Sequence, residues 1–290
     1  MVCSEFRAIV GDHIADTFLF VSSQPSSSDE LRRSVLCDLF SQVMRSAAND
    51  VRQQLSSLLP SLSSLESRTL AACPNQKPND LDVSPLILRL AKQYPGDVGI
   101  FAPFFLNCFQ LAPGEAIFLG PNEPHAYLDG DCVEAMACSD NVVRAGLTPK
   151  LRDVDTLCSM LTYKAMYPSI DRGQPLDEHS VCYVPPVEEF CVIRTVLPAR
   201  SAAPYTLTPL PDASVLLVYS GHERVQLVSQ TDNGRTYVGR TGVTLLLSGH
   251  AVVQVLLTGE TTSNAPLVLF RCSRNHRFAT STTAPATSHL

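Results

Sequence analysis

An Asp129-Gly130 pair between two strand-like runs restricts the local fold more than any other part of the 290-residue chain. Both central positions of a two-residue type I′ turn need a positive φ angle, which Asp and Gly tolerate. The pair therefore predicts a β-hairpin. The register follows by counting outward from the turn, which places Leu128 opposite Asp131 and His125 opposite Glu134.

The alternation of side chains along a strand gives this predicted hairpin two faces. One face carries mostly polar chemistry and the other carries small apolar groups: His125, Tyr127, Cys132, Glu134 and Met136 on the first, and Ala126, Leu128, Val133 and Ala135 on the second. Directly opposed side chains have Cβ atoms roughly 5 Å apart. The His125 imidazole and the Glu134 carboxylate could then serve as a metal ligand with its neighbour, or as an acid and base pair.

Two cations and another carboxylate follow within one short segment, at Asp140, Arg144 and Lys150. A Gly-Leu-Thr-Pro loop between Arg144 and Lys150 is able to aim both cations at one ligand. A guanidinium can form two parallel hydrogen bonds with a phosphate, and an ammonium acts as a point charge. The segment therefore indicates an anionic ligand of about the size of a phosphate.

A family resemblance rests on the run from Gln110 to Lys150, which reads QLAPGEAIFLGPNEPHAYLDGDCVEAMACSDNVVRAGLTPK. This run resembles the signature block of the type I phosphomannose isomerases, also called mannose-6-phosphate isomerases. The order of a helical segment and then many short strands is similar to the last two-thirds or so of that family. The resemblance implies a zinc-dependent enzyme with a cupin-like β-fold. Such an enzyme interconverts mannose 6-phosphate and fructose 6-phosphate and supplies mannose for GDP-mannose synthesis.

The resemblance also implies roles for single residues. His125 matches the family's histidine zinc ligand, and Arg144 matches its catalytic arginine. Four further residues match positions that line the substrate pocket: Tyr127, Glu134, Asp140 and Lys150. We expect Lys150 at the phosphate end of the substrate and Arg144 near the charge that develops in an enediolate. Glu134 or Asp140 could be the base or could orient a ligand, and the sequence does not choose between them.

The chain also departs from the family pattern. Family members take their other zinc ligands from an upstream Gln-x-His pair and a Lys-Pro-Glu run, whereas here Lys77-Pro78 is followed by Asn79. Catalytic zinc sites use about three protein ligands, and His125 is one. We therefore expect an N-terminally incomplete chain whose remaining ligands lie upstream. Two functions stay open: a zinc-dependent isomerase, or a catalytically inactive truncated fragment that binds a sugar phosphate or acts as an interaction module.

Composition excludes several other classes of protein. A net charge of −6 with scattered basic residues disfavours binding to nucleic acid or to a membrane surface. No apolar run approaches the roughly 18 residues of a membrane span. The ten cysteines are dispersed without a C-x-x-C pair, which favours reduced thiols. We expect a cytoplasmic monomer whose partner is a small-molecule sugar phosphate.

The periodicity of apolar residues changes along the chain. Capping-box spacing at Ser27 and Glu30, followed by apolar residues every three or four positions, predicts one long or broken helix that ends near Pro60. Ser84 with Pro85 predicts a second helix that runs to Tyr94. Short strands are predicted after that, at residues 100–106, 116–119, 190–196, 215–219, 225–228, 243–247, 252–257 and 267–272.

The predicted fold class is mainly β with a helical segment: an N-terminally incomplete, cupin-like jelly roll preceded by an α-helical region. Five segments follow from the same patterns. They are a mainly helical region at residues 1–98, site-bearing cupin-like strands at 99–165, a connecting loop at 166–189, a C-terminal β-domain at 190–279 and a disordered tail at 280–290.

Overall fold

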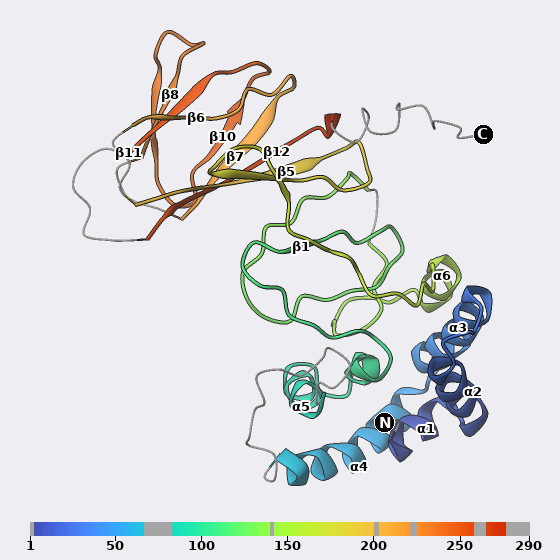
Figure 1. Ribbon diagram of the computed structural model, residues 1–290. Helices are drawn as coiled ribbons and strands as arrows, with labels where there is room; N and C mark the ends of the chain where they lie inside the picture. Colours follow the sequence, from blue (N-terminus) through green and yellow to red (C-terminus); the bar gives the residue numbers. More distant parts are fainter. Residues whose placement is uncertain are drawn as a thin grey trace, which may run out of the picture. The chain divides into compact units, whose positions relative to one another are not determined.

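The chain forms two compact units. The computed structural model describes residues 3–66, 83–139, 142–199, 203–220, 225–257 and 265–276 (Figure 1). The first unit, called the helical unit, comprises Met1–Leu111, Leu119–Leu128 and Asp140–Ser169, and the second, called the β-unit, comprises Ala112–Phe118, Asp129–Ser139 and Ile170–Leu290. Across these described ranges, no helix combines the length and apolar character that crossing a membrane requires.

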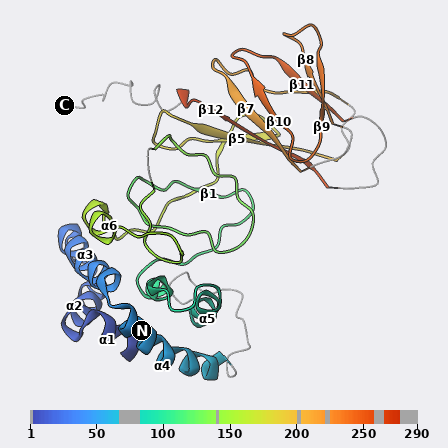
Figure 2. The same cartoon turned by 180° about the vertical axis from the view of Figure 1, so that it is seen from behind.

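The helical unit is built from short and medium-length helices around one apolar core. In chain order they are α1 (Ser4–Val10), α2 (Asp12–Ser23), α3 (Asp29–Arg45), α4 (Ala48–Glu66), α5 (Ser84–Gln93), the 3-10 helix η2 (Val98–Phe104) and α6 (Val154–Met160). Helices α2 and α3 lie side by side (Figures 1 and 2). Phe6, Leu39, Ile87 and Phe101 are fully buried at the centre of this unit.

The predicted long helix is broken into α3 and α4. Ser28 caps α3, because its hydroxyl accepts a hydrogen bond from the backbone N–H of Leu31 at 3.2 Å, so the start lies one residue after the predicted Ser27. The predicted end near Pro60 is wrong, since α4 continues to Glu66 with Pro60 inside it. A proline removes one backbone donor and strains one turn. Leu55 and Leu58, on the same helix, are buried in the helical core, and this burial offsets the loss.

The second predicted helix is confirmed as α5, with Pro85 in its first turn. It ends at Gln93, and Gly96 follows with a φ angle of +76°. The strand predicted at residues 100–106 is wrong, because this segment forms η2. Asp97 caps η2 through a hydrogen bond from the N–H of Gly99, and Ile100 and Phe101 are buried in the helical core. An apolar run this short does not distinguish a strand from a buried helical turn.

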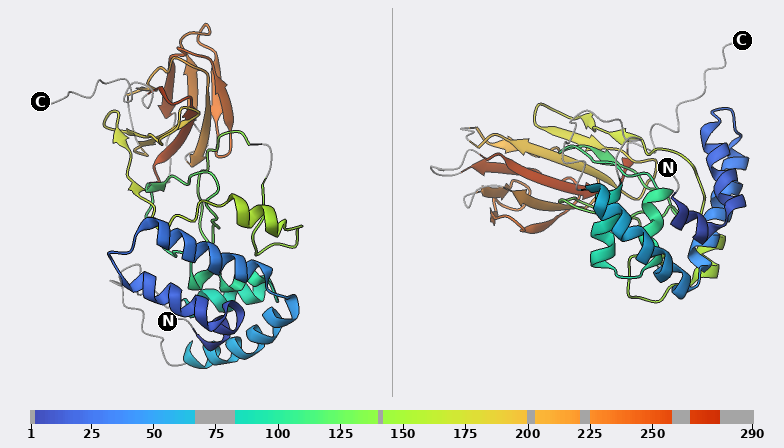
Figure 3. Two further views of the ribbon diagram at one scale, coloured as in Figure 1. Left: turned by 90° about the vertical axis from the view of Figure 1, so that its right-hand side faces the viewer. Right: turned by 90° about the horizontal axis from the view of Figure 1, so that it is seen from below.

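The β-unit contains antiparallel sheets. The largest has the strand order β10 (Thr244–Leu247), β7 (Ser214–Ser220), β12 (Leu267–Ser273), β5 (Cys191–Leu197), β4 (Ser180–Tyr183) and β3 (Gln174–Pro175). The second has the order β6 (Tyr205–Thr206), β11 (Val253–Leu257), β8 (Val225–Ser229) and β9 (Thr236–Gly239). β1 (Ala116–Ile117) pairs with β2 (Ile170–Asp171). Figure 3 shows the strands of the larger sheets layered against each other.

One apolar core joins the two larger sheets. Strands β5 and β12 are fully paired, and in both strands every second residue is buried. Leu216 of β7, Leu227 of β8 and Val255 of β11 are all buried in the same cluster. Alternating apolar residues on two facing sheets are the pattern of a β-sandwich. The predicted fold class, mainly β with a cupin-like jelly roll and a helical region, is confirmed.

Residues 166–189 differ from the expected connecting loop, because they contain β2, β3 and β4. β4 pairs with β5 along its whole length, with Ser180 opposite Thr195 and Tyr183 opposite Val192. The prolines and the glycine in this segment favoured a loop prediction, but they all lie outside β4. The predicted tail at residues 280–290 lies outside the described residues.

Candidate functional site

The Asp129-Gly130 turn does not form the predicted type I′ hairpin. Gly130 has a φ angle of +94°, but Asp129 does not have the positive φ that this turn requires. Between β1 and α6, the described residues contain no helix or strand. An isolated two-stranded hairpin is marginal in water unless one face is buried. Here Leu128 is 38% exposed and Val133 is 39% exposed, so the expected apolar face is too exposed to stabilise the ladder.

His125 is exposed, and contacts at one side of its ring orient it. Its Nδ1 lies 2.9 Å from the carbonyl oxygen of Glu123. Because a carbonyl can only accept, Nδ1 carries the proton and donates it, which leaves the lone pair on Nε2. The ring also lies against Tyr127, with 5.6 Å between centroids. A backbone acceptor that fixes the tautomer in this way is typical of histidines that bind metals.

Glu123 fixes the turn that leads to His125. Its Oε2 accepts a hydrogen bond from the N–H of Gly120 at 3.0 Å, and its Oε1 lies 3.7 Å from Nζ of Lys164. The carboxylate therefore ties two parts of the helical unit together beside the candidate ligand. Sequence patterns did not single out Glu123, although it lies within the signature run.

The described residues do not assemble a metal site by themselves. No cluster of three or more His, Cys, Asp or Glu side chains that could hold a metal occurs within those ranges. His125 therefore stands as one candidate ligand, which is fewer than the three or so that catalytic zinc requires. The donor set of this part of the chain does not fit a complete zinc site.

The segment that carries the two predicted cations is held against the helical core. Val143, Ala145 and Leu147 pack on that core, and Arg144 lies between two of them, half-buried. Lys150 is exposed, and its backbone N–H donates to Oγ1 of Thr148 at 3.2 Å. We call residues 144–150 the cationic loop. Asp140, also predicted in the pocket, lies outside the described residues.

Asp97 anchors the cationic loop and was missed as a site residue. Its Oδ1 accepts hydrogen bonds from the N–H groups of Gly99 at 2.7 Å and Leu147 at 2.9 Å, and its Oδ2 accepts one from Thr148 at 3.4 Å. The Asp-Val-Gly sequence at this point signals a helix cap. Nothing in the local sequence joins residue 97 to a loop fifty positions later.

The remaining predicted pocket residues are exposed. Tyr127 is 57% exposed and belongs to the helical unit, as do His125, Arg144 and Lys150. Glu134 is exposed and belongs to the β-unit. No described strand includes His125 or Glu134, so the strand pairing predicted between them does not form. Their roles stay predictions.

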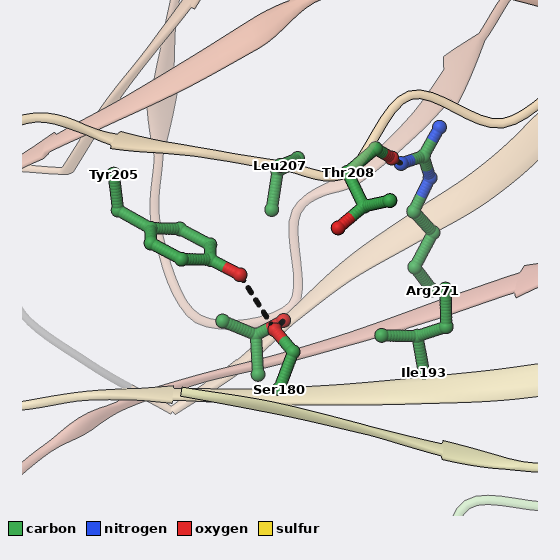
Figure 4. A pocket seen from close by; sticks show the side chains of 7 residues that line it. Ser180, Ile193, Tyr205, Leu207, Thr208 and Arg271 are labelled. Carbon is green, nitrogen blue, oxygen red and sulfur yellow. Dashed lines mark hydrogen bonds between the residues drawn. The ribbon is translucent and has the colours of Figure 1, made fainter. Parts of the chain in front are cut away.

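A separate polar cluster lies inside the β-unit, where it lines a cavity of about 10 Å³ (Figure 4). Oγ of Ser180 lies 2.7 Å from Oγ1 of Thr195 and 2.6 Å from the hydroxyl of Tyr205, which in turn donates to Asp177 at 2.8 Å. Burial is the main reason that the pKa of Tyr205 rises to about 12. A cavity of this size holds about one water molecule, so this cluster is too small for a sugar phosphate.

Arg271 crosses the same cluster as a buried cation. Its side chain donates from Nε to Oγ of Ser214 at 2.8 Å and from Nη1 to the carbonyl of Thr208 at 2.6 Å, and the residue is 3% exposed. Burial lowers its pKa. These bonds join β12 to β7 and to the segment after β6, so the cluster stabilises the β-unit.

The fold and the cationic loop define a class: a cupin-like β-protein with a helical domain. Comparison with known proteins specifies the family. Residues 9–106 match the model of the helical insertion domain of type I phosphomannose isomerase. The chain is 40% identical to mannose-6-phosphate isomerase 2 of Arabidopsis thaliana over 94% of its length, and 42% identical to mannose-6-phosphate isomerase of Bos taurus over 88%. The chain belongs to the type I phosphomannose isomerase family.

A solved structure agrees with this assignment at the level of fold. The crystal structure of a mutant phosphomannose isomerase from Salmonella typhimurium matches 93% of this chain and 62% of its own, with a TM-score of 0.61 and 23% sequence identity. The chain spans 57% and 58% of the lengths of the Arabidopsis and bovine relatives. It therefore corresponds to a little over half of a protein of this family.

Proposed function

We propose that this chain carries the part of a mannose-6-phosphate isomerase that binds the phosphosugar, in an enzyme that interconverts mannose 6-phosphate and fructose 6-phosphate. The observation that carries the proposal is the cationic loop, which holds Arg144 and Lys150 on a backbone fixed by Asp97 and by the helical core. Family membership and the similarity to mannose-6-phosphate isomerases support the same reaction.

In this proposal the two cations act at different ends of the substrate. Isomerisation moves a proton between C1 and C2 through a cis-enediol, and negative charge develops on a sugar oxygen. Arg144 stabilises that charge from a fixed position, and Lys150 binds the phosphate as a point charge. The family resemblance supports roles in substrate binding for Tyr127, Glu134 and Asp140, with either carboxylate as the candidate base.

We also propose zinc as the cofactor, with His125 as one ligand. The other ligands come from outside the described residues, because these contain no three-ligand cluster. The orientation of the His125 ring supports this role, since the bond from Nδ1 to Glu123 leaves Nε2 to bind metal. We also propose that the protein is a cytoplasmic monomer that acts on a free sugar phosphate. Its product would supply mannose for GDP-mannose synthesis.

Titration calorimetry tests the substrate class. The chain is titrated with mannose 6-phosphate and with mannose, beside the variants Lys150→Ala and Arg152→Ala. Arg152 is exposed and lies just outside the cationic loop, so its variant is a control with a similar loss of charge. We expect the Lys150 variant to weaken binding of mannose 6-phosphate by on the order of tenfold or more, as for loss of a charged hydrogen bond. Equal affinity for mannose and its phosphate would contradict the proposal.

A further inference from the structure

We infer that Asp97 is a positioning residue, which sets the conformation of the cationic loop and through it the placement of Arg144 and Lys150. The inference rests on the proposed function for its catalytic consequence. Its structural part concerns only residues of the helical unit. It goes beyond the family resemblance, which assigns no role to Asp97.

The carboxylate of Asp97 joins two segments that are distant in sequence. One donor, the N–H of Gly99, lies in η2 directly after Asp97, and the other two, from Leu147 and Thr148, lie in the cationic loop. An ionised carboxylate accepts at both oxygens and donates at neither. It therefore satisfies the first turn of η2 and two successive loop amides at once.

The loop conformation needs such an acceptor. Leu147 has a φ angle of +54°, which lies in the left-handed region that residues other than glycine rarely adopt. Strained backbone of this kind persists only where the surroundings determine it strongly. Successive N–H groups at a left-handed residue point to one side and form a concave site for an anion, and the Asp97 carboxylate occupies it.

The two backbones lie in direct contact at this point. A Cβ atom placed on Gly99 would lie 2.8 Å from the backbone N of Leu147, and one placed on Gly146 would lie 2.8 Å from Cα of Gly99. Neither glycine has a positive φ angle, so close approach is the reason for glycine at both positions. This contact brings the loop amides within reach of the short Asp97 side chain.

The backbone held by Asp97 determines where both Arg144 and Lys150 lie. Arg144 lies between Val143 and Ala145, which pack on the helical core, and the residues held by Asp97 follow directly. Lys150 comes two residues after Thr148 and donates its own N–H to the Thr148 hydroxyl. The backbone next to Arg144 and next to Lys150 is therefore held in place before a ligand binds. Such preorganisation is the condition for electrostatic stabilisation of a transition state.

Asp97 could instead be only the cap of η2, and the substitution Asp97→Ser separates the two roles. Serine is a good N-cap residue, so this variant keeps an acceptor for Gly99. Its short side chain has a single oxygen and no second acceptor for the loop amides. Asp97→Asn keeps one carbonyl oxygen and is expected to give an intermediate effect. Asp177→Ser is the matched control, because Asp177 accepts bonds from His179, Ser180 and Tyr205 in the β-unit.

Hydrogen exchange of the full chain, followed by mass spectrometry on peptides that cover residues 143–150, decides the structural part. We expect exchange at Leu147 and Thr148 to accelerate on the order of tenfold or more in Asp97→Ser, less in Asp97→Asn and not at all in Asp177→Ser. Unchanged exchange in Asp97→Ser would show that Asp97 is a cap and nothing more, and would overturn the inference.

Kinetics with mannose 6-phosphate decide the catalytic part. In the protein formed by joining this chain to the part of the bovine relative that it does not match, we expect kcat/KM to fall at least about tenfold in Asp97→Ser, with partial rescue by asparagine. A loosened loop with an unchanged kcat/KM would overturn the catalytic consequence. Absence of turnover in the joined protein, together with absence of mannose 6-phosphate binding by the chain, would contradict the proposed function, and the exchange result would still decide whether Asp97 holds the loop.

Discussion

Replacing Gly146 with alanine tests how tightly the cationic loop is packed on η2. The added Cβ would lie 2.8 Å from Cα of Gly99 and 3.0 Å from Oδ1 of Asp97, whereas ordinary contact begins at 3.4 Å. The loop and η2 must therefore separate by about half an ångström. Because Gly146 has no positive φ angle, the cost is steric and not conformational.

The magnitude follows from two contributions. Overpacking a well-packed site costs about 1–3 kcal/mol. The separation also lengthens the bonds from Asp97 to Leu147 and Thr148, and weakening one hydrogen bond costs about 1 kcal/mol. We expect Gly146→Ala to lower the free energy of unfolding of the helical unit by about 2–4 kcal/mol. That is a large part of the stability of a typical domain.

Urea unfolding followed by far-ultraviolet circular dichroism measures this change, since every helix described lies in the helical unit. Gly120→Ala is the matched control: Gly120 also lacks a positive φ, and its nearest neighbour is the Glu123 carboxylate at 3.1 Å, at the end of a flexible side chain. We expect the control to cost less than about 1 kcal/mol. Equal destabilisation by the two variants would refute the close contact between Gly99 and Gly146.

Four more predictions follow from other parts of the chain. Pro60→Ala restores a backbone donor inside α4 and should raise the free energy of unfolding by about 1–3 kcal/mol, measured in urea; a decrease would contradict the description of α4. Arg271→Lys cannot keep both bonds to Ser214 and Thr208. The variant should lower the free energy of unfolding of the β-unit by about 1–3 kcal/mol, measured by thermal unfolding. Burial raises the pKa of Tyr205 to about 12, against an ordinary value of 10.0. Its contribution to the free energy of unfolding is therefore complete below pH 10.0 and is lost as the pH rises to about 12. An absorbance titration that compares the unchanged chain with Tyr205→Phe measures this, and ionisation of that hydroxyl at its ordinary pKa would contradict it. His125→Gln should abolish zinc binding in equilibrium dialysis of an isomerase that contains this chain, and retained binding would exclude His125 as a ligand.

The parts of the fold that alternation or capping controls could be predicted from the sequence. Strands β5, β7 and β12 were found within a residue or two, because apolar residues at every second position bury one face. Helix α5 was predicted from Ser84 and Pro85, which lie in its first turn. The short strand β4 was missed, since its neighbours are rich in turn residues and its pairing with β5 is a tertiary contact.

The candidate site could be predicted only in part. The family resemblance proposes His125, Arg144 and Lys150 as site residues, and their roles stay predictions. The hairpin prediction failed because the Asp129-Gly130 pair specifies a bend, whereas a ladder also needs a packed face. Asp97 could not be found from local patterns, since its partners Leu147 and Thr148 lie fifty residues away.

Turnover of mannose 6-phosphate shows whether this chain supplies the catalytic part of an isomerase. The chain is assayed with zinc, alone and joined to the part of the bovine relative that it does not match, with Arg144→Ala and Arg152→Ala in parallel. We expect formation of fructose 6-phosphate by the joined protein, a loss on the order of a hundredfold or more in kcat for Arg144→Ala, and little change for Arg152→Ala. A joined protein that binds zinc without turnover, or an Arg144 variant with full activity, would contradict it.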